Sequence, residues 1–138
     1  MYIDDLKIDG YELSSVSVDN YGFSFSYYPV KQEDEVSSIS ITFDRPESWQ
    51  GLCSEEIFKI RLEQAESQGW GELTEDDMIY SKKFVEVSMR MEDTIVIIRD
   101  FSKQKNYEEL RDLANQVIKT AELVDVEYEL DVMRRSEN

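Results

Sequence analysis

Alternating apolar and polar residues predict three strands in the first third of the chain. Residues 23–28 alternate aromatic side chains with serine or tyrosine, and residues 39–43 alternate isoleucine or phenylalanine with serine or threonine. A period of two residues is typical of a half-buried strand. Residues 11–18 predict a further strand, and the turn residues at 19–22 join it to residues 23–28 in a hairpin.

Two later segments carry helical patterns. Ser54 is expected to cap the first helix, which has apolar residues at helical spacing and ends at Gly69. The second helix begins near Asn106, which is followed three residues later by Glu109 in the pattern of a capping box. The apolar stripe of this second helix, which we expect to be buried, consists of Leu110, Leu113, Ala114, Val117, Ile118 and Ala121.

Three more segments predict strands. Residues 85–91 alternate between apolar and polar side chains, whereas residues 95–98 are apolar on both faces, as expected of a central strand. Residues 124–132 alternate strictly between apolar and acidic side chains, which again indicates a strand.

The order of these elements predicts a single α+β domain over residues 1–138. We expect an antiparallel sheet of about six strands with two helices packed on one face of it. Residues 1–10 and 133–138 are expected to be frayed ends.

The chain is strongly acidic and has no histidine. It carries 31 acidic and 15 basic residues, which gives a net charge of −16. Because 41% of the residues are hydrophobic and 12% are aromatic, the charge belongs to a folded exterior rather than to a disordered chain. Nucleic acids and anionic membranes are disfavoured partners, since binding them depends on Lys and Arg. A basic protein is the favoured partner; the alternative is that the acidity serves only solubility.

The sequence offers few means of catalysis. It lacks histidine, the Gly-x-Ser-x-Gly nucleophile motif and the Gly-Lys-Ser/Thr phosphate loop. Its one cysteine, Cys53, excludes zinc sites built from histidine and cysteine, and also excludes an intrachain disulfide. We therefore expect no enzyme activity, no cofactor and no metal. A buried, inert thiol is expected at Cys53, and a reactive thiol at a helix N-terminus is the alternative.

The N-terminal residues predict a cytoplasmic protein. They lack the basic start and apolar run of a secretory signal. No stretch approaches the ~20 apolar residues that a membrane span needs.

The strand predicted at residues 124–132 would place a row of carboxylates on one face, about 6.5–7 Å apart. This acidic rail is either the solvated side of an edge strand or a docking surface for Lys and Arg of a partner. Calcium or magnesium binding is a third possibility, although this spacing does not converge on one ion. The candidate partner-binding residues of the rail are Asp125, Glu127, Glu129 and Asp131, with Tyr128 among them.

A second group of candidate partner-binding residues lies in the segment of the sequence between the two predicted helices. Residues 72–77 form an acidic loop without the Asp-x-Asp-x-Asp-Gly spacing of a calcium loop. An exposed tryptophan beside carboxylates makes a good protein-binding hot spot, and Trp70 stands just before this loop; packing at the core or its rim is the alternative for Trp70. The candidate partner-binding residues here are Trp70, Glu72, Glu75, Asp76 and Asp77.

The run Tyr21-Gly22-Phe23-Ser24-Phe25-Ser26-Tyr27-Tyr28-Pro29 resembles the aromatic strand that ends in Tyr-Pro in PsbP-like proteins. The order of elements from there to Ala121, about 100 residues, is similar to that fold. This resemblance implies a small binding protein related to Eag-type chaperones of secreted effectors. The chain departs from the family in its extra acidic strand near the C-terminus.

Two functions follow from these observations. The first is an immunity protein or inhibitor that binds and neutralises a basic toxin or effector domain, as a monomer or homodimer. The alternative is a PsbP-like effector chaperone or assembly factor that binds an apolar segment. An inhibitor should use acidic side chains, whereas a chaperone should use an apolar groove on the sheet.

Overall fold

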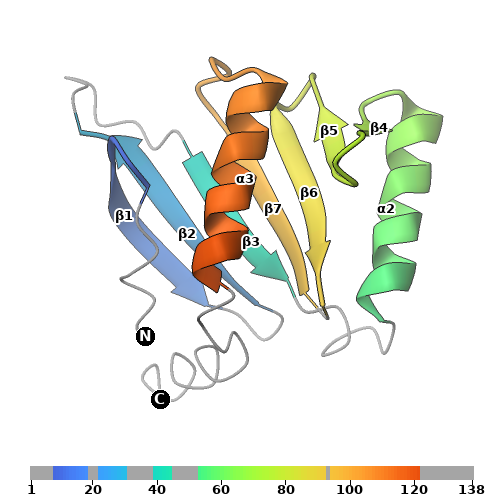
Figure 1. Ribbon diagram of the computed structural model, residues 1–138, viewed down its shortest axis with the longest axis horizontal. Helices are drawn as coiled ribbons and strands as arrows, with labels where there is room; N and C mark the ends of the chain where they lie inside the picture. The colour runs from blue at the N-terminus through green and yellow to red at the C-terminus, as the bar shows by residue number, and fades with distance from the viewer. Residues whose placement is uncertain (1–7, 19–21, 31–38, 45–52, 93, 122–138) are drawn as a thin grey trace.

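The computed structural model describes residues 8–18, 22–30, 39–44, 53–92 and 94–121. These residues form one antiparallel sheet of seven strands with two helices (Figure 1). The strand order across the sheet is β1-β2-β3-β7-β6-β5-β4, so β1 and β4 lie at its two edges. The predicted α+β class and antiparallel sheet are confirmed; two of the seven strands, at residues 72–73 and 79–81, were not predicted.

The first three strands are β1 (Tyr11–Val18), β2 (Gly22–Pro29) and β3 (Ile39–Asp44). They pair as successive antiparallel neighbours, as the alternating pattern predicts. Gly22, the first residue of β2, lies very close to the backbone of β3. A Cβ atom at Gly22 would lie 2.0 Å from the Phe43 carbonyl oxygen, so no other residue fits there without a shift of the backbone.

The middle of the chain contains α2 (Ser54–Gln68), β4 (Glu72–Leu73) and β5 (Ile79–Ser81). Gly69 ends α2 in a left-handed conformation with φ 73°, as predicted. Ser54 does not cap the helix: the N-cap is Cys53, and the Ser54 hydroxyl donates to the Glu92 carbonyl oxygen. The Ser54 side chain therefore makes a tertiary hydrogen bond instead of the N-cap hydrogen bond that the local pattern predicts.

The strands β6 (Glu86–Met91) and β7 (Thr94–Asp100) form the centre of the sheet, and α3 (Tyr107–Ala121) follows them. The predicted capping box of α3 is confirmed. The Glu109 backbone N–H donates to Asn106 Oδ1 at 2.9 Å, and the Asn106 N–H donates to Glu109 Oε1 at 3.2 Å.

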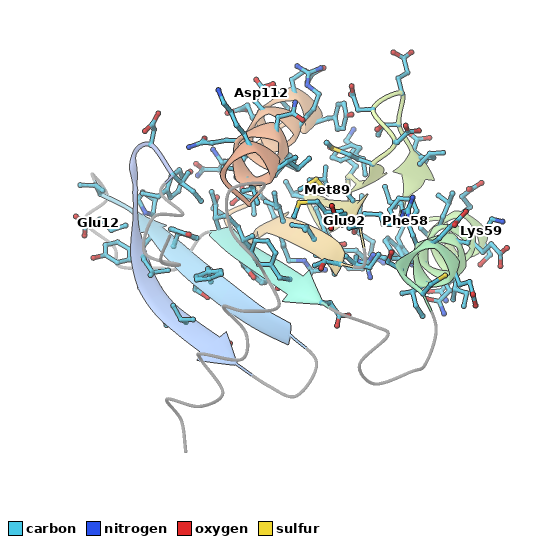
Figure 2. The ribbon with its side chains drawn as sticks, turned by 60° about the horizontal axis from the view of Figure 1, so that its bottom comes forward. Glu12, Phe58, Lys59, Met89, Glu92 and Asp112 are labelled. Carbon is cyan, nitrogen blue, oxygen red and sulfur yellow. The ribbon has the colours of Figure 1, made fainter. Side chains whose placement is uncertain are left out.

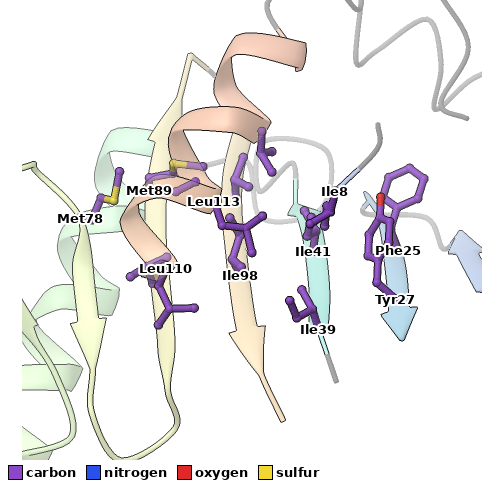
Figure 3. Packing of buried hydrophobic residues seen from close by; sticks show 14 of the residues in the cluster. Ile8, Phe25, Tyr27, Ile39, Ile41, Met78, Met89, Ile98, Leu110 and Leu113 are labelled. Carbon is purple, nitrogen blue, oxygen red and sulfur yellow. The ribbon is translucent and has the colours of Figure 1, made fainter. Parts of the chain in front are cut away.

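The hydrophobic core lies between α3 and one face of the sheet (Figure 3). Figure 3 shows Leu110 and Leu113 of α3 over Met89 and Ile98 of the central strands. The cluster extends to β2 and β3, where the alternating residues of the predicted strands are buried. Its members on those two strands are Phe25, Tyr27, Ile39, Ile41 and Phe43.

The two helices lie on opposite faces of the sheet, so the prediction that both pack on one face is wrong. Successive residues of a strand point to opposite faces. In β6, Val87 and Met89 belong to the core under α3, whereas Glu86 and Ser88 hydrogen-bond to Arg61 of α2. The contact between α2 and the sheet is partly polar. The spacing of apolar residues along the sequence therefore does not predict which face α2 covers.

Two predictions on other residues have different outcomes. The predicted strand at 124–132 lies outside the described residues. Cys53 is exposed, so the prediction of a buried thiol is wrong; its Sγ contacts Glu56 Oε1 at 3.3 Å. Neither described helix is long and apolar enough to cross a membrane.

Candidate functional site

Of the acidic loop predicted at 72–77, Glu72 and Leu73 form β4, and the rest belongs to the exposed turn between β4 and β5. Its backbone is fixed by Thr74, whose N–H donates to the Met78 carbonyl oxygen at 2.8 Å and whose carbonyl oxygen accepts from Asp77 N–H at 3.2 Å. The Thr74 hydroxyl oxygen also accepts from the N–H groups of Asp76 and Met78, both at 3.3 Å. The loop therefore holds one shape while the side chains of Glu72, Glu75, Asp76 and Asp77 stay exposed.

Asp77 adopts a positive φ of 59° at the end of this turn. Asp and Asn tolerate this left-handed region better than most other residues. The residue type that suits this turn conformation therefore also supplies a negative charge. Replacing Asp77 by Asn would remove the charge and keep the backbone preference.

Tyr107, in the first turn of α3, anchors the acidic loop to the body of the protein. Its hydroxyl is hydrogen-bonded to Thr74 Oγ1 at 2.9 Å and to the Asp76 carboxylate. Its ring packs on Tyr80 of β5, with the ring centroids 5.2 Å apart. Burial, and after it the hydrogen bond to Asp76, raise the pKa of the Tyr107 hydroxyl, so it stays a protonated donor to Asp76 at neutral pH.

The surroundings of the loop are acidic as well. Glu108, Glu109 and Asp112 are exposed on the first two turns of α3, and Figure 2 shows Asp112 on the outer side of this helix. Arg111, a cation on the same helix, forms an ion pair with Asp112 at 3.2 Å. We call the exposed carboxylates of Glu72, Glu75, Asp76 and Asp77, together with Trp70, the acidic edge.

Trp70 and Glu72 meet at a hollow of about 390 Å³ beside the loop. The Trp70 ring is half-buried and fixed: the Arg61 guanidinium lies 5.5 Å from its centroid and the Phe84 ring lies 5.7 Å away. Trp70 therefore forms a rigid wall of the hollow. The hollow is lined by Gly69, Trp70, Gly71, Glu72, Tyr80, Lys82 and Lys83.

A buried carboxylate on the sheet holds α2 in place. Glu86 of β6 is only 5% exposed. Its carboxylate contacts Arg61 of α2 at 2.8 Å and Arg99 of β7 at 3.3 Å, and Arg61 Nε donates to Ser88 Oγ at 2.9 Å. Two cations compensate one buried anion, which is the condition under which a buried charge is tolerated.

The structure therefore brings together one of the two predicted surfaces. Trp70, Glu72, Glu75, Asp76 and Asp77 lie in or directly before the β4–β5 hairpin; their role in binding a partner stays a prediction. Asp125, Glu127, Tyr128, Glu129 and Asp131 of the acidic rail lie outside the described residues, so the rail stays a prediction.

Sequence reasoning missed Tyr107, Lys82 and Lys83. Tyr107 lies just after the predicted capping residue, but no local pattern links it to a loop about thirty residues earlier. The two lysines follow β5, which was itself not predicted. These contacts depend on the tertiary arrangement of the hairpin.

No cluster of three acidic or cysteine side chains able to hold a metal ion is present within the described ranges. Comparisons of the chain with protein-family models, with curated proteins and with solved structures found no match. The resemblance to PsbP-like proteins accordingly stays a prediction.

Proposed function

We propose that the protein is a protein-binding module that recognises a basic protein through the acidic edge. The observation that carries this proposal is the rigid mounting of the 72–77 loop. Thr74 fixes its backbone, the Tyr107 hydroxyl binds the side chains of Thr74 and Asp76, and its acidic side chains are exposed. Charges fixed in place before binding steer an oppositely charged partner and lose little conformational entropy on association.

Trp70 complements these carboxylates as an aromatic anchor. Tryptophan is frequent among the residues that dominate binding energy at protein interfaces. Its ring is held by Arg61 and Phe84, so binding costs it little rotamer entropy. A basic, concave or loop-bearing surface on the partner fits this arrangement.

Within this class, the proposed role is that of an immunity protein or inhibitor in the cytoplasm that covers and neutralises a basic toxin or effector domain. The net charge of −16 favours fast association with such a domain. Tight neutralisation needs both this steering and a fixed anchor, and the acidic edge supplies both. No catalytic step and no cofactor belong to this proposal.

The proposal is tested by recovering the partner with matched variants as baits. Glu75→Gln with Asp77→Asn removes two charges from the acidic edge and retains the backbone preference at position 77. Glu63→Gln with Glu66→Gln removes two charges from exposed positions of α2. A pull-down from the native host, read by mass spectrometry, should yield a basic protein that is lost from the first bait and kept by the second.

A second function, chaperoning an apolar segment, is favoured by one observation. At the β1–β2 edge of the sheet, Leu13, Val16 and Val30 are exposed by 37%, 39% and 52%. A partner retained by both charge variants, but lost after Leu13→Ser with Val16→Ser, would support the chaperone and contradict the inhibitor.

A further inference from the structure

A cationic surface stands out at one end of the sheet in this acidic protein. The loops at 82–85 and 101–106 contain no Asp or Glu, but they carry four lysines. The two loops lie side by side, because the Asp100 N–H donates to the Val85 carbonyl oxygen at 2.9 Å. We call Lys82, Lys83, Phe84, Arg99, Phe101 and Lys103 the cationic end.

Arg99 is the centre of the cationic end. Its guanidinium lies 4.9 Å from the Phe84 ring centroid and 5.6 Å from the Phe101 ring centroid. The Glu86 carboxylate lies 3.3 Å from Arg99 Nε and compensates its charge. The Arg99 Nε–H nevertheless makes no aligned hydrogen bond. A planar cation held between two aromatic rings is pre-oriented for carboxylates, because little ordering is left for binding to impose.

The rim of the cationic end is open to solvent. Lys82, Lys83 and Lys103 are exposed, and Phe101 is 55% exposed. Aromatic residues and arginine are enriched at protein interfaces, so the exposed Phe101 beside Arg99 has the composition of an interface, and the lysines add charge around it. The described structure provides no cover for Phe101, although burying it would be favourable.

The backbone of both loops is also unusual. Val85 adopts a φ of 51° and Lys103 a φ of 58°. A β-branched residue rarely adopts a positive φ, and such a conformation is unfavourable on its own. Burial of Val85 in the core stabilises it, and the loops retain these shapes at the surface where the lysines gather.

We propose that the cationic end is a docking surface for an acidic segment of a protein partner, whose carboxylates contact the lysines and Arg99 and whose apolar side chain covers Phe101. Charge complementarity selects this occupant. A long polyanion such as DNA would also meet the acidic remainder of the molecule, whereas a short segment responds to charges within about 8–10 Å at physiological salt. The inference concerns the opposite charge and does not depend on the proposed function, but the cationic end adjoins the acidic edge: Lys82 and Lys83 line the same hollow as Trp70 and Glu72, and the Phe84 ring packs on Trp70.

The probe is a fluorescein-labelled synthetic peptide that alternates glutamate with tyrosine, and a glutamine-for-glutamate version is its neutral control. Binding to the full chain is followed by fluorescence anisotropy at low and physiological salt. The test variant combines Lys82→Gln, Lys83→Gln and Lys103→Asn, where asparagine suits the positive φ. The matched control combines Lys59→Gln, Arg90→Gln and Lys119→Gln, which removes the same charge from other exposed positions.

The acidic peptide should bind in a salt-dependent manner, and the neutral peptide should not. The test variant should weaken binding by about tenfold or more, and the matched control by less than about twofold. Phe101→Ala should weaken binding severalfold at unchanged charge. These three results together support the proposal.

Four results would overturn it. The first is no binding of the acidic peptide at low salt, and the second is an equal loss in both triple variants, because then only net charge matters. The third is equal or tighter binding of single-stranded DNA of the same charge. The fourth is a dimer, detected by light scattering, that is lost in the test variant and kept in the matched control. That result would identify a second copy of the chain as the occupant.

Discussion

The buried carboxylate of Asp100 organises the connection between β7 and α3. Asp100 is 1% exposed. Its carboxylate accepts from the N–H groups of Ser102, Gln104 and Lys105, each at 3.0 Å, and from the Ser102 hydroxyl. Burial alone would raise the pKa of this carboxyl, but the hydrogen bonds outweigh burial and lower it below its ordinary value.

This lowered pKa gives stability a pH dependence of known sign. The ionised form is favoured in the folded state, so its contribution is present above the unfolded pKa of about 4. The contribution is lost as the pH falls through the lower folded-state pKa. Asp100→Asn should destabilise the protein by about 1–3 kcal/mol at pH 7, because an amide cannot accept all these hydrogen bonds.

Urea unfolding of the wild type and of Asp100→Asn, measured from pH 7 to pH 2.5, checks this prediction. The difference in unfolding free energy should be constant above about pH 5 and should shrink in more acidic solution. A difference that is the same at every pH would show that the Asp100 charge makes no contribution.

Leu113 tests the core at the same scale. It lies on the sheet-facing side of α3 and is 7% exposed. Leu113→Ala should reduce the free energy of unfolding by about 2–4 kcal/mol, since it removes buried apolar surface and leaves a cavity. Leu73→Ala, at a position 47% exposed, should cost much less. Equal urea midpoints for these two variants would contradict the core described above.

At the scale of elements, the contact between α3 and the β4–β5 hairpin decides whether the acidic edge is rigid. The hairpin is short, with two residues in β4 and three in β5. Such a small ribbon is only marginally stable alone. Its loop is tied to α3 through the Tyr107 hydroxyl, in addition to the pairing of β5 with β6.

Tyr107→Phe removes this link and leaves the ring contact with Tyr80. The amides of Asp77 and Met78 should then exchange with deuterium about two- to tenfold faster, as expected for the loss of about 1 kcal/mol of local stability. Tyr28→Phe is the matched control, since it deletes a hydroxyl that donates to Glu12 at 2.6 Å in another part of the sheet. Equal loop exchange in both variants would show that Tyr107 does not fix the loop.

Elements with a strong local pattern were predictable from the sequence. The strands β1, β2, β3, β6 and β7 follow period-two alternation or apolar runs, and α3 follows a stripe with a capping box. β4 and β5 were missed because two or three residues carry no measurable period, and their pairing is imposed by β6. The face covered by α2 was missed because Arg61, Glu86 and Ser88 form that contact through polar groups.

The candidate site was predictable in composition but not in geometry. The acidic residues 72–77 and Trp70 are visible in the sequence, and two of them, Trp70 and Glu72, line one hollow. The anchor on Tyr107 and the lysines that line the hollow come from segments apart in the sequence. Only the folded arrangement joins them, so no local pattern indicates them.

At the scale of the whole molecule, charge is distributed unevenly. A net charge of −16 gives a field that attracts basic proteins from a distance, but a field alone does not select one surface. The acidic edge adds a fixed location, with carboxylates and an aromatic ring held by neighbouring elements. The central claim is that this location, rather than the total charge, determines where a basic partner binds.

The predicted rail at Asp125, Glu127, Glu129 and Asp131 is the rival location on the same chain. Changing its four residues to Asn or Gln removes more charge than the double change at the acidic edge. If location matters more than total charge, this larger neutralisation should have the smaller effect on association. The comparison therefore separates the two surfaces.

The most direct measurement is the association rate of the recovered basic partner, by stopped-flow fluorescence at low and physiological salt. Glu75→Gln with Asp77→Asn should slow association at low salt by about tenfold, and the difference should shrink as salt screens the steering. Glu63→Gln with Glu66→Gln, and the neutralised rail, should each slow it by less than about threefold. An equal effect of the two double variants, or a larger effect of the rail, would contradict the account.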